Sequence, residues 1–352
     1  QDQYAILQNI ASNHGVKVTH IKPHGALNNM ACEDIELAKI IAKAVYEIDK
    51  NLIYLVPTGS KMELAAKKLN MNIACEIFAD RNYEDDGNLV SRSKQHALIT
   101  DPEQAKKHVF LDKPIANTIS EAKEITQVCK NEGVTLSVGY QRRREGHFRW
   151  MREKIASGQF GIVVQAEANI SRDREGKFEL GHWRYTAEGM PGGVMLQIGL
   201  HYIDVLTMLL GPIKSVSGMA SQLVLPGDNP DVGSLMMTHV NGSISTLNTS
   251  YASASEYYVM NIYGKKMSAY YNLFDGLRAL KQGDDKTSLI SVNKVDTLAE
   301  QLVEWADAAQ GGGEPEVGGD SATGSLAVVK AGILSVNERR HVEVAEILSG
   351  AL

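Results

Sequence analysis

The 352-residue chain contains 43% hydrophobic and 22% charged residues, a balance typical of a globular protein that is large enough for two hydrophobic cores. Its formal net charge of -6 gives no electrostatic reason to expect nucleic acid or an anionic membrane as a partner. Cys32, Cys75 and Cys129 are widely spaced and form no C-x-x-C pair, so neither a disulfide framework nor a zinc site is indicated.

No apolar run approaches the roughly 20 residues that a membrane-spanning helix needs, and the first residues lack the character of a signal peptide. We therefore expect a cytoplasmic protein that acts on a small molecule and holds no metal. The sequence begins without Met inside a predicted amphipathic helix carrying Tyr4, Ile6 and Ile10, which suggests a further segment upstream.

Residues 16–78 alternate short apolar runs with helical periodicity, which is typical of βα units around a parallel sheet or an incomplete barrel. One helix is predicted behind Asp34, a good N-cap, because the apolar residues that follow it share one face. A second is predicted behind the capping box Ser60–Glu63. The predicted strands are Val16–Ile21, Leu52–Val56 and Asn72–Phe78.

A turn-rich stretch, residues 82–107, separates this part from a second β-α-β unit. There, the strand Val109–Asp112 is followed by a helix capped by Thr118–Glu121 and by the strand Val134–Gly139. We predict a first domain over residues 1–107, a β-α-β segment over 108–140 and a third domain over 141–352.

In the third domain, several strands follow one another without intervening helices, which predicts an α+β domain with a mixed or antiparallel sheet. Asn241-Gly242 predicts a hairpin with a type I′ turn. The box Thr297–Glu300 predicts a helix. The remaining predicted elements are the strand Ile162–Ile170, the helices Leu196–Leu210 and Leu326–Leu334, and the surface loop Gly311–Gly319.

Three polar clusters could carry chemistry. Asp112-Lys113-Pro114 ends a buried strand, at the sheet edge where ligands collect, although a surface Lys beside a turn Pro has the same pattern. The segment Gly139–Arg143 supplies donors for hydroxyls or phosphate, or forms a solvated basic turn. Gln197, His201 and Asp204 would share one helix face at spacings i, i+4 and i+7, although a histidine on an apolar helix is usually a satisfied core residue.

In order and spacing, these clusters resemble the E-K-P, G-[YHF]-x-R-R and G-G-x-x-x-[DQ]-x-G-x-H-x-x-D patterns of the Gfo/Idh/MocA oxidoreductase family, over residues 108–352. The resemblance implies hydride transfer between a sugar, inositol or related polyol and NAD or NADP. It implies that Lys113 polarises the reacting hydroxyl, that His201 is the general base and that Asp204 orients His201. Gln197 stands where Asp is frequent. The resemblance further implies cofactor contacts from Asp112, Pro114, Tyr140, Gln141 and Arg142, and substrate contacts from His182, Trp183 and Arg184.

No G-x-G-x-x-G motif follows a strand anywhere in the chain. That loop allows backbone amides and a helix N-terminus to meet a pyrophosphate. Thr58-Gly59-Ser60, at a helix start, is the one stretch suited to the phosphates of a dinucleotide, and an ordinary helix cap is the simpler interpretation. We therefore expect weak or absent dinucleotide binding and an impaired oxidoreductase.

Three segments of the first domain resemble the LamB/YcsF family, which includes the A subunit of 5-oxoprolinase: Ile21–Asn29, Glu76–Tyr83 and Gly87–Arg92. The resemblance implies a (β/α) barrel that acts with partner subunits on 5-oxoproline, using ATP. It places five charged residues at the barrel mouth. These residues are Lys22, His24, Glu76, Asp80 and Arg81. A loop salt bridge between Asp80 and Arg81 would explain that pair equally well.

The sequence thus predicts two incomplete enzymes in one chain, either an accidental fusion or a recombined protein. The oxidoreductase fragment is our main functional hypothesis, and a 5-oxoprolinase component is the second. The third is a non-catalytic module that forms homo-oligomers through the C-terminal sheet.

Overall fold

The structure is a computed structural model that describes residues 2–76, 94, 108–177, 182–309 and 313–350. Contacts divide the chain into two compact units, Gln1–Lys106 and Lys107–Leu352. Most of the predicted turn-rich stretch, residues 82–107, lies outside the described residues. None of the described helices combines the length and the apolar character that crossing a bilayer requires.

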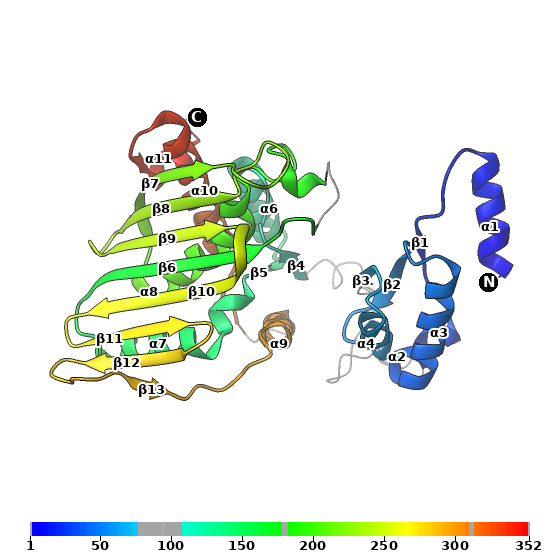
Figure 1. Cartoon of the computed structure of the whole chain (residues 1–352), viewed down its shortest axis with the longest axis horizontal. Helices are drawn as coiled ribbons and strands as arrows, with labels where there is room; N and C mark the ends of the chain where they lie inside the picture. Colours follow the sequence, from blue (N-terminus) through cyan, green and yellow to red (C-terminus); the bar gives the residue numbers. More distant parts are fainter. Residues whose placement is uncertain (1, 77–93, 95–107, 178–181, 310–312, 351–352) are drawn as a thin grey trace. The chain divides into compact units, whose positions relative to one another are not determined.

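The first unit contains a three-stranded parallel sheet in the order β1-β2-β3 (Figure 1). The strands are β1 (His20–Ile21), β2 (Ile53–Pro57) and β3 (Ile73–Glu76). The prediction that the first strand begins at Val16 was wrong, because only His20 and Ile21 pair with β2 and Val16 is exposed. The parallel βα organisation itself is confirmed.

Two of this unit's helices are capped as their sequences predict. The Asp34 carboxylate accepts hydrogen bonds from two amides at the start of α3 (Ile35–Ile48). Ser60 accepts from the Glu63 amide at the start of α4 (Lys61–Lys68). The other described helices of this unit are α1 (Asp2–Asn13), whose residues are all at least partly exposed, and α2 (Ala26–Glu33). Small residues such as Ala38 and Ala66 form much of the core, so the helices can pack closely on β2.

The second unit begins with the predicted β-α-β segment. Strand β4 (His108–Asp112) pairs in parallel with β5 (Thr135–Gly139), and α6 (Ile119–Asn131) connects them. Thr118 and Glu121 form the complete reciprocal capping box at the start of α6. Val138 donates its amide to the carbonyl of Val317, and Val317 is buried. The predicted surface loop Gly311–Gly319 is therefore partly a buried segment along β5.

A mixed sheet dominates this unit, as predicted, with the described strands in the order β13-β12-β11-β10-β6-β9-β8-β7-β14 (Figure 1). Strands β6 and β9 are parallel, and the other neighbours are antiparallel. The strands are β6 (Val163–Asp173), β7 (Ile213–Ser221), β8 (Val232–His239), β9 (Ile244–Ser250), β10 (Ala252–Gly264), β11 (Met267–Asn272), β12 (Gly276–Lys281), β13 (Ser288–Ile290) and β14 (Val342–Glu343).

The predicted hairpin between β8 and β9 is present, but its type I′ turn is not. A type I′ turn requires positive φ at both Asn241 and Gly242, and only Gly242 has it, at 89°. The amide of His239 donates to the carbonyl of Ser243, and the amide of Gly242 donates to the carbonyl of His239. This is the three-residue loop in which the glycine alone takes the left-handed conformation.

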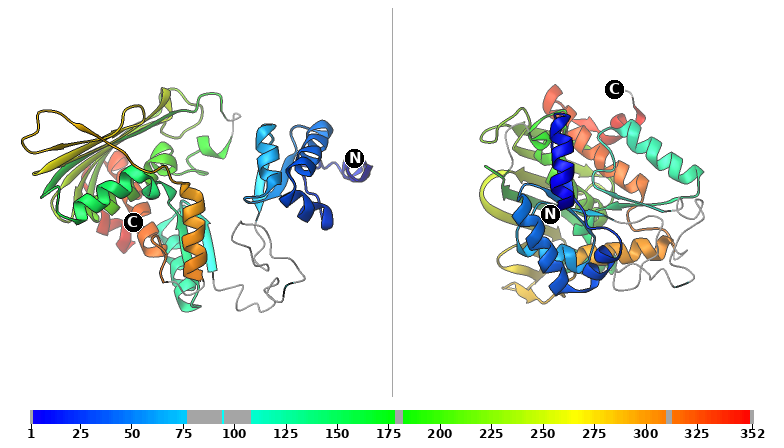
Figure 2. Two further views of the ribbon diagram at one scale, coloured as in Figure 1. Left: turned by 90° about the horizontal axis from the view of Figure 1, so that it is seen from below. Right: turned by 90° about the vertical axis from the view of Figure 1, so that its right-hand side faces the viewer.

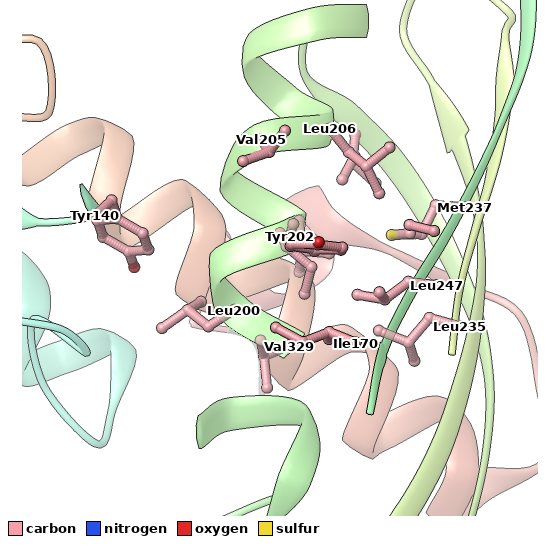
Figure 3. Packing of buried hydrophobic residues seen from close by; sticks show 14 of the residues in the cluster. Tyr140, Ile170, Leu200, Tyr202, Val205, Leu206, Leu235, Met237, Leu247 and Val329 are labelled. Atoms are coloured by element: carbon pink, nitrogen blue, oxygen red, sulfur yellow. The ribbon is translucent and has the colours of Figure 1, made fainter. Parts of the chain in front are cut away.

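Helices cover one face of the large sheet (Figure 2). They include α7 (Gly146–Ala156), α8 (Leu200–Leu210), α10 (Gly319–Glu338) and α11 (Val344–Ser349). Figure 3 shows Leu206 of α8 pointing toward Met237 of β8 in the core. Helix α10 is longer than the predicted Leu326–Leu334. In α9 (Thr297–Ala309) the capping carboxylate is that of Asp296, one residue before the predicted cap, because it accepts from the amides of Leu298 and Ala299.

Candidate functional site

Lys113 lies directly after β4, and the peptide bond that joins it to Pro114 is cis. Its Nζ donates a 2.5 Å hydrogen bond to the main-chain oxygen of Gln197. Burial lowers the pKa of Lys113 to about 8; the carboxylate of Asp112 opposes this shift and three guanidinium groups add to it. The three are those of Arg172, Arg184 and Arg142. A lysine with this pKa is partly deprotonated near neutral pH, whereas a lysine with an ordinary pKa is almost fully protonated there.

Gln197 lies in a π-helical segment, η3 (Met195–Gly199), that runs directly into α8. We expected Gln197, His201 and Asp204 to follow one face of a regular α-helix. The wider turn changes that geometry at Gln197, whose main-chain oxygen is held by Lys113. π-Helical turns are rare and occur frequently at functional sites.

His201, in the first turn of α8, is 8% exposed, and its Nδ1 has no hydrogen-bond partner among the described residues. Burial holds the pKa of His201 well below its usual value, and the charges of Lys113, Arg142 and Arg172 lower it further. The imidazole is therefore neutral at neutral pH and can accept a proton. A core histidine with every nitrogen satisfied, the alternative interpretation of the sequence, does not describe this residue.

Asp204 is 1% exposed and has a different partner from the one that the sequence favoured. Both of its oxygens accept from Arg143, over 2.8 Å to Nε and 2.5 Å to Nη2. Burial raises the pKa of the Asp204 carboxyl, and Arg143 opposes that shift. This bidentate pair fixes α8 to the loop after β5, and among the described residues no hydrogen bond is recorded between Asp204 and His201.

The predicted cofactor residues lie in different environments. Asp112 is exposed, and Pro114 is partly exposed. Tyr140 is 1% exposed within the core, and its hydroxyl has no hydrogen-bond partner among the described residues. Gln141 and Arg142 belong to η1 (Gln141–Arg144).

Arg142 connects η1 with the large sheet. Its guanidinium lies 4.6 Å from the centre of the Tyr258 ring on β10, and its Nη1 is 3.0 Å from a carboxylate oxygen of Glu145. The charge of Arg142 also acts on both Lys113 and His201. Arg142 is therefore part of the site around Lys113.

The predicted substrate residues lie at η2 (Trp183–Tyr185), beside the same site. Trp183 is 46% exposed, so it is not the core residue that the sequence also allowed. The guanidinium of Arg184 lies 4.2 Å from the centre of the Trp183 ring, and the His182 ring stacks on that of Trp183 with 5.7 Å between the ring centres. Arg184 also lines a small cavity together with Gln197.

Two arginines of the site were not singled out from the sequence. Arg172 belongs to β6, and its Nε donates a 2.8 Å hydrogen bond to the hydroxyl of Tyr258. Arg174 follows the same strand and lies 6.0 Å from the ring of Tyr251. The sequence signal for these residues is two arginines separated by one residue, Arg172-Asp173-Arg174, at the end of a strand. An exposed turn can have the same sequence, so this signal does not identify a site.

In the first unit, two of the predicted barrel-mouth residues meet. Lys22, directly after β1, pairs with both oxygens of Glu76, the last residue of β3, at 2.6 and 2.8 Å. Both lie at the carboxyl end of their parallel strands. His24 is exposed, and Asp80 and Arg81 lie outside the described residues. Within the part of the chain that is described, no three His, Cys, Asp or Glu side chains gather as they would to hold a metal ion.

The turn between β2 and α4 does not fit a pyrophosphate. The amide of Gly59 donates to the carboxylate of Glu63 at 2.7 Å, and the hydroxyl of Ser60 donates to the carbonyl of Pro57 at 2.7 Å. A phosphate bound there would have to displace the Glu63 carboxylate. Thr58-Gly59-Ser60 is thus an ordinary helix cap.

Two family models match the chain, each over less than half of it. The LamB/YcsF family model matches residues 1–134, and the GFO/IDH/MocA C-terminal domain model matches residues 148–270. The first match continues through β4 and α6, so it extends beyond the boundary between the two compact units.

The curated relatives resemble the first part. The chain is 47% identical over 110 residues to the A subunit of 5-oxoprolinase from Clostridium beijerinckii, covering 31% of this chain and 43% of the relative. It is 42% identical over 134 residues to the same protein from Staphylococcus aureus, covering 38% of this chain and 50% of the relative. The chain therefore spans half or less of the length of these relatives.

Solved structures of oxidoreductases resemble the chain over most of its length. A candidate NADPH-dependent oxidoreductase from Desulfitobacterium hafniense has 27% identity and a TM-score of 0.68, over 88% of this chain and 95% of that one. Levoglucosan dehydrogenase in complex with NADH and levoglucosan has 16% identity and a TM-score of 0.64, over 87% and 96%. At that identity the second likeness shows the fold alone.

These matches agree with the two sets of motifs. The chain combines a segment that matches the LamB/YcsF family, residues 1–134, with a segment that matches the GFO/IDH/MocA C-terminal domain, residues 148–270.

Proposed function

We propose that the second unit contains the substrate site of an oxidoreductase that acts on a sugar, inositol or related polyol, and that hydride transfer is impaired in this chain. One observation carries the proposal. A partly buried lysine, Lys113, and a buried neutral imidazole, His201, lie close enough for the charge of the first to act on the second. The similar oxidoreductase structure from Desulfitobacterium hafniense, at 27% identity, supports the class of reaction.

The two groups have complementary roles toward a carbinol. Lys113 commits one of its three donors to the Gln197 carbonyl, which fixes the ammonium and leaves two donors for a substrate oxygen. Below a pH of about 8 the lysine is protonated, so it can stabilise a developing alkoxide. His201 has an unpartnered Nδ1 and can accept the hydroxyl proton.

We propose that the dinucleotide is the part of this reaction for which the described residues supply no site of the G-x-G-x-x-G type. The helix start at Thr58-Gly59-Ser60 is closed by Glu63, whose carboxylate accepts from the Gly59 amide. The proposed roles of Lys113 and His201 therefore include no step through NAD or NADP. We propose the impairment on this ground, because the substrate groups alone supply no hydride acceptor.

Calorimetric titration of the full chain with myo-inositol, D-glucose and D-glucitol tests the substrate site. We expect at least one polyol to bind, and Lys113→Met to weaken it at least tenfold. Lys214→Gln, which removes an exposed charge on β7 of the same sheet, is the matched control. If no polyol binds, the proposed site is wrong. A separate titration with NADH and NADPH tests the impairment, which low-micromolar binding would disprove.

A second candidate function is a component of a 5-oxoprolinase, and two observations favour it. The Lys22–Glu76 pair lies at the carboxyl edge of β1 and β3, and the first part of the chain is 47% identical to the A subunit of a 5-oxoprolinase. We propose that it would act with partner subunits and ATP on 5-oxoproline. The test adds the partner subunits from Clostridium beijerinckii and ATP to the chain and measures ADP release with and without 5-oxoproline. Release that depends on 5-oxoproline, and that Lys22→Met abolishes, supports this role. Absence of release counts against it.

Association of two copies through the large sheet is a third proposal. The sheet face opposite the helices carries exposed apolar side chains on β8, β9 and β10: Met236, Ile244 and Tyr257. Sedimentation velocity should show a dimer that Met236→Lys dissociates. A monomer at every concentration would refute it.

A further inference from the structure

The loop between β7 and β8, residues 222–231, contacts two segments of the proposed substrate site. One is η2, which carries the predicted substrate residues Trp183 and Arg184. The other is η3, whose Gln197 holds Lys113. The loop, η2 and η3 all line one small cavity. The position of the loop therefore sets the position of η2 relative to η3.

Asn229 holds η2 through its side chain. Its amide nitrogen, Nδ2, donates to the main-chain oxygen of Arg184 at 3.3 Å and to that of Thr186 at 2.6 Å. These two acceptors fix the orientation of the amide, because only its nitrogen can donate to a carbonyl. Asn229 is 6% exposed, so its side chain has little room to adopt another position.

The main chain of the loop also contacts η2. The amide of Asp228 donates to the carbonyl of Tyr185 at 3.2 Å, and the Asp228 carboxylate accepts from the amide of Ala187 at 2.7 Å. Gly227 has a φ of +102°, and a Cβ there would lie 2.1 Å from the Tyr185 oxygen. The loop and η2 are therefore packed in direct contact, and a side chain at residue 227 would separate them.

On its other side, the loop is fixed to the start of η3. The carbonyl of Pro230 accepts from the amide of Val194 at 3.2 Å, and a Cβ on Gly193 would lie 2.4 Å from the same oxygen. The carboxylate of Asp231, which is 1% exposed, accepts hydrogen bonds from three consecutive amides of the loop, those of residues 223–225. The loop is thus held in one conformation while it connects η2 with η3.

This inference rests on the proposed function and adds a residue to its site. We propose that Asn229 is a positioning residue for the polyol. By holding η2, it sets the distance between Trp183, which is 46% exposed and can contact a ligand, and Lys113, which η3 holds. A polyol that contacts both residues binds well only when that distance is correct.

Calorimetric titration of the full chain with myo-inositol, D-glucose and D-glucitol tests this role. Asn229→Ala should weaken the binding of the preferred polyol about tenfold, because η2 loses two hydrogen bonds that hold it. Asn229→Ser, whose hydroxyl can still donate to one of the two carbonyls, should weaken it less. Asn248→Ala, at an exposed asparagine of β9, is the matched control and should leave the affinity within about twofold.

Double-mutant cycles separate positioning from a general loss of structure. Once Trp183→Ala has removed the ligand contact of η2, Asn229→Ala should change the affinity by less than about twofold. In the Lys113→Met background, its effect should remain about tenfold, because η3 rather than η2 holds Lys113. Equal effects of Asn229→Ala in both backgrounds would overturn the inference.

Hydrogen exchange of the chain without ligand gives a second measurement. Asn229→Ala should accelerate exchange of the amides of residues 183–187 at least about fivefold and leave those of β8 unchanged. If exchange at residues 183–187 is unchanged, or if the polyol binds equally well to Asn229→Ala, the inference is overturned and the proposed function stands. If no polyol binds to the unchanged chain, the proposed function fails and the inference fails with it.

Discussion

Breaking the buried pair between Arg143 and Asp204 should destabilise the second unit severely. Arg143→Met would leave the Asp204 carboxylate, 1% exposed, without its two charged hydrogen bonds. Hydrogen bonds to charged groups contribute about 1.5–3 kcal/mol each. Removing one partner of a buried pair costs about 3–5 kcal/mol, which is our expectation for the loss in unfolding free energy.

Urea denaturation followed by circular dichroism measures this loss, and the chain offers a control of similar length. Lys130 and Asp320 approach to 2.6 Å, but their side chains are 56% and 76% exposed. Lys130→Met should therefore cost less than about 1 kcal/mol. The double variant Arg143→Met/Asp204→Leu should recover much of the stability, because no buried charge is then left unpaired. Equal losses for Arg143→Met and Lys130→Met would refute this reasoning.

Three further predictions concern stability. The pKa of Lys113 in the folded chain, about 8, lies below its ordinary value of 10.5, so the unfolded chain binds more protons between these two pH values. The unfolding free energy should therefore rise with pH across that window, by about 3 kcal/mol. Urea titrations at several pH values should show this rise in the unchanged protein and no such rise in Lys113→Met. Thr118→Ala should cost about 1 kcal/mol by removing the cap of α6, and an unchanged denaturation midpoint would contradict that role. Gly193→Ala places a methyl group 2.4 Å from the Pro230 carbonyl at a φ of +51° and should lower the melting temperature, whereas Gly324→Ala, in open space on α10, should raise it.

Local signals predicted the elements that depend on local contacts. The helices behind Asp34, Ser60 and Thr118 begin where their capping side chains place them, because a cap acts within four residues of its own position. The length of β1 was not predictable in this way. It is limited to two residues by its pairing with β2, a contact more than 30 residues away.

The site shows the same division. Lys113 and His201 could be singled out from motifs, but the partner of Asp204 could not. Arg142 and Arg143 are adjacent in sequence, and only the packing of η1 directs the first to Tyr258 and the second to Asp204. Arg172 reaches Tyr258 because β6 pairs with β10, across 86 residues, and no spacing within β6 reports that pairing.

The π-helical turn at Met195–Gly199 makes this region sensitive to chain length. Successive residues of an α-helix are rotated by about 100° about its axis. A one-residue deletion that converts the π-helical turn into a regular α-helical turn would therefore rotate the residues that precede the deletion relative to His201. The oxygen of residue 197 would then swing away from the lysine that it anchors. Homologous chains with one residue fewer at this point would need a different way to immobilise Lys113. The number of residues between Gly193 and His201 therefore indicates how such a site is assembled.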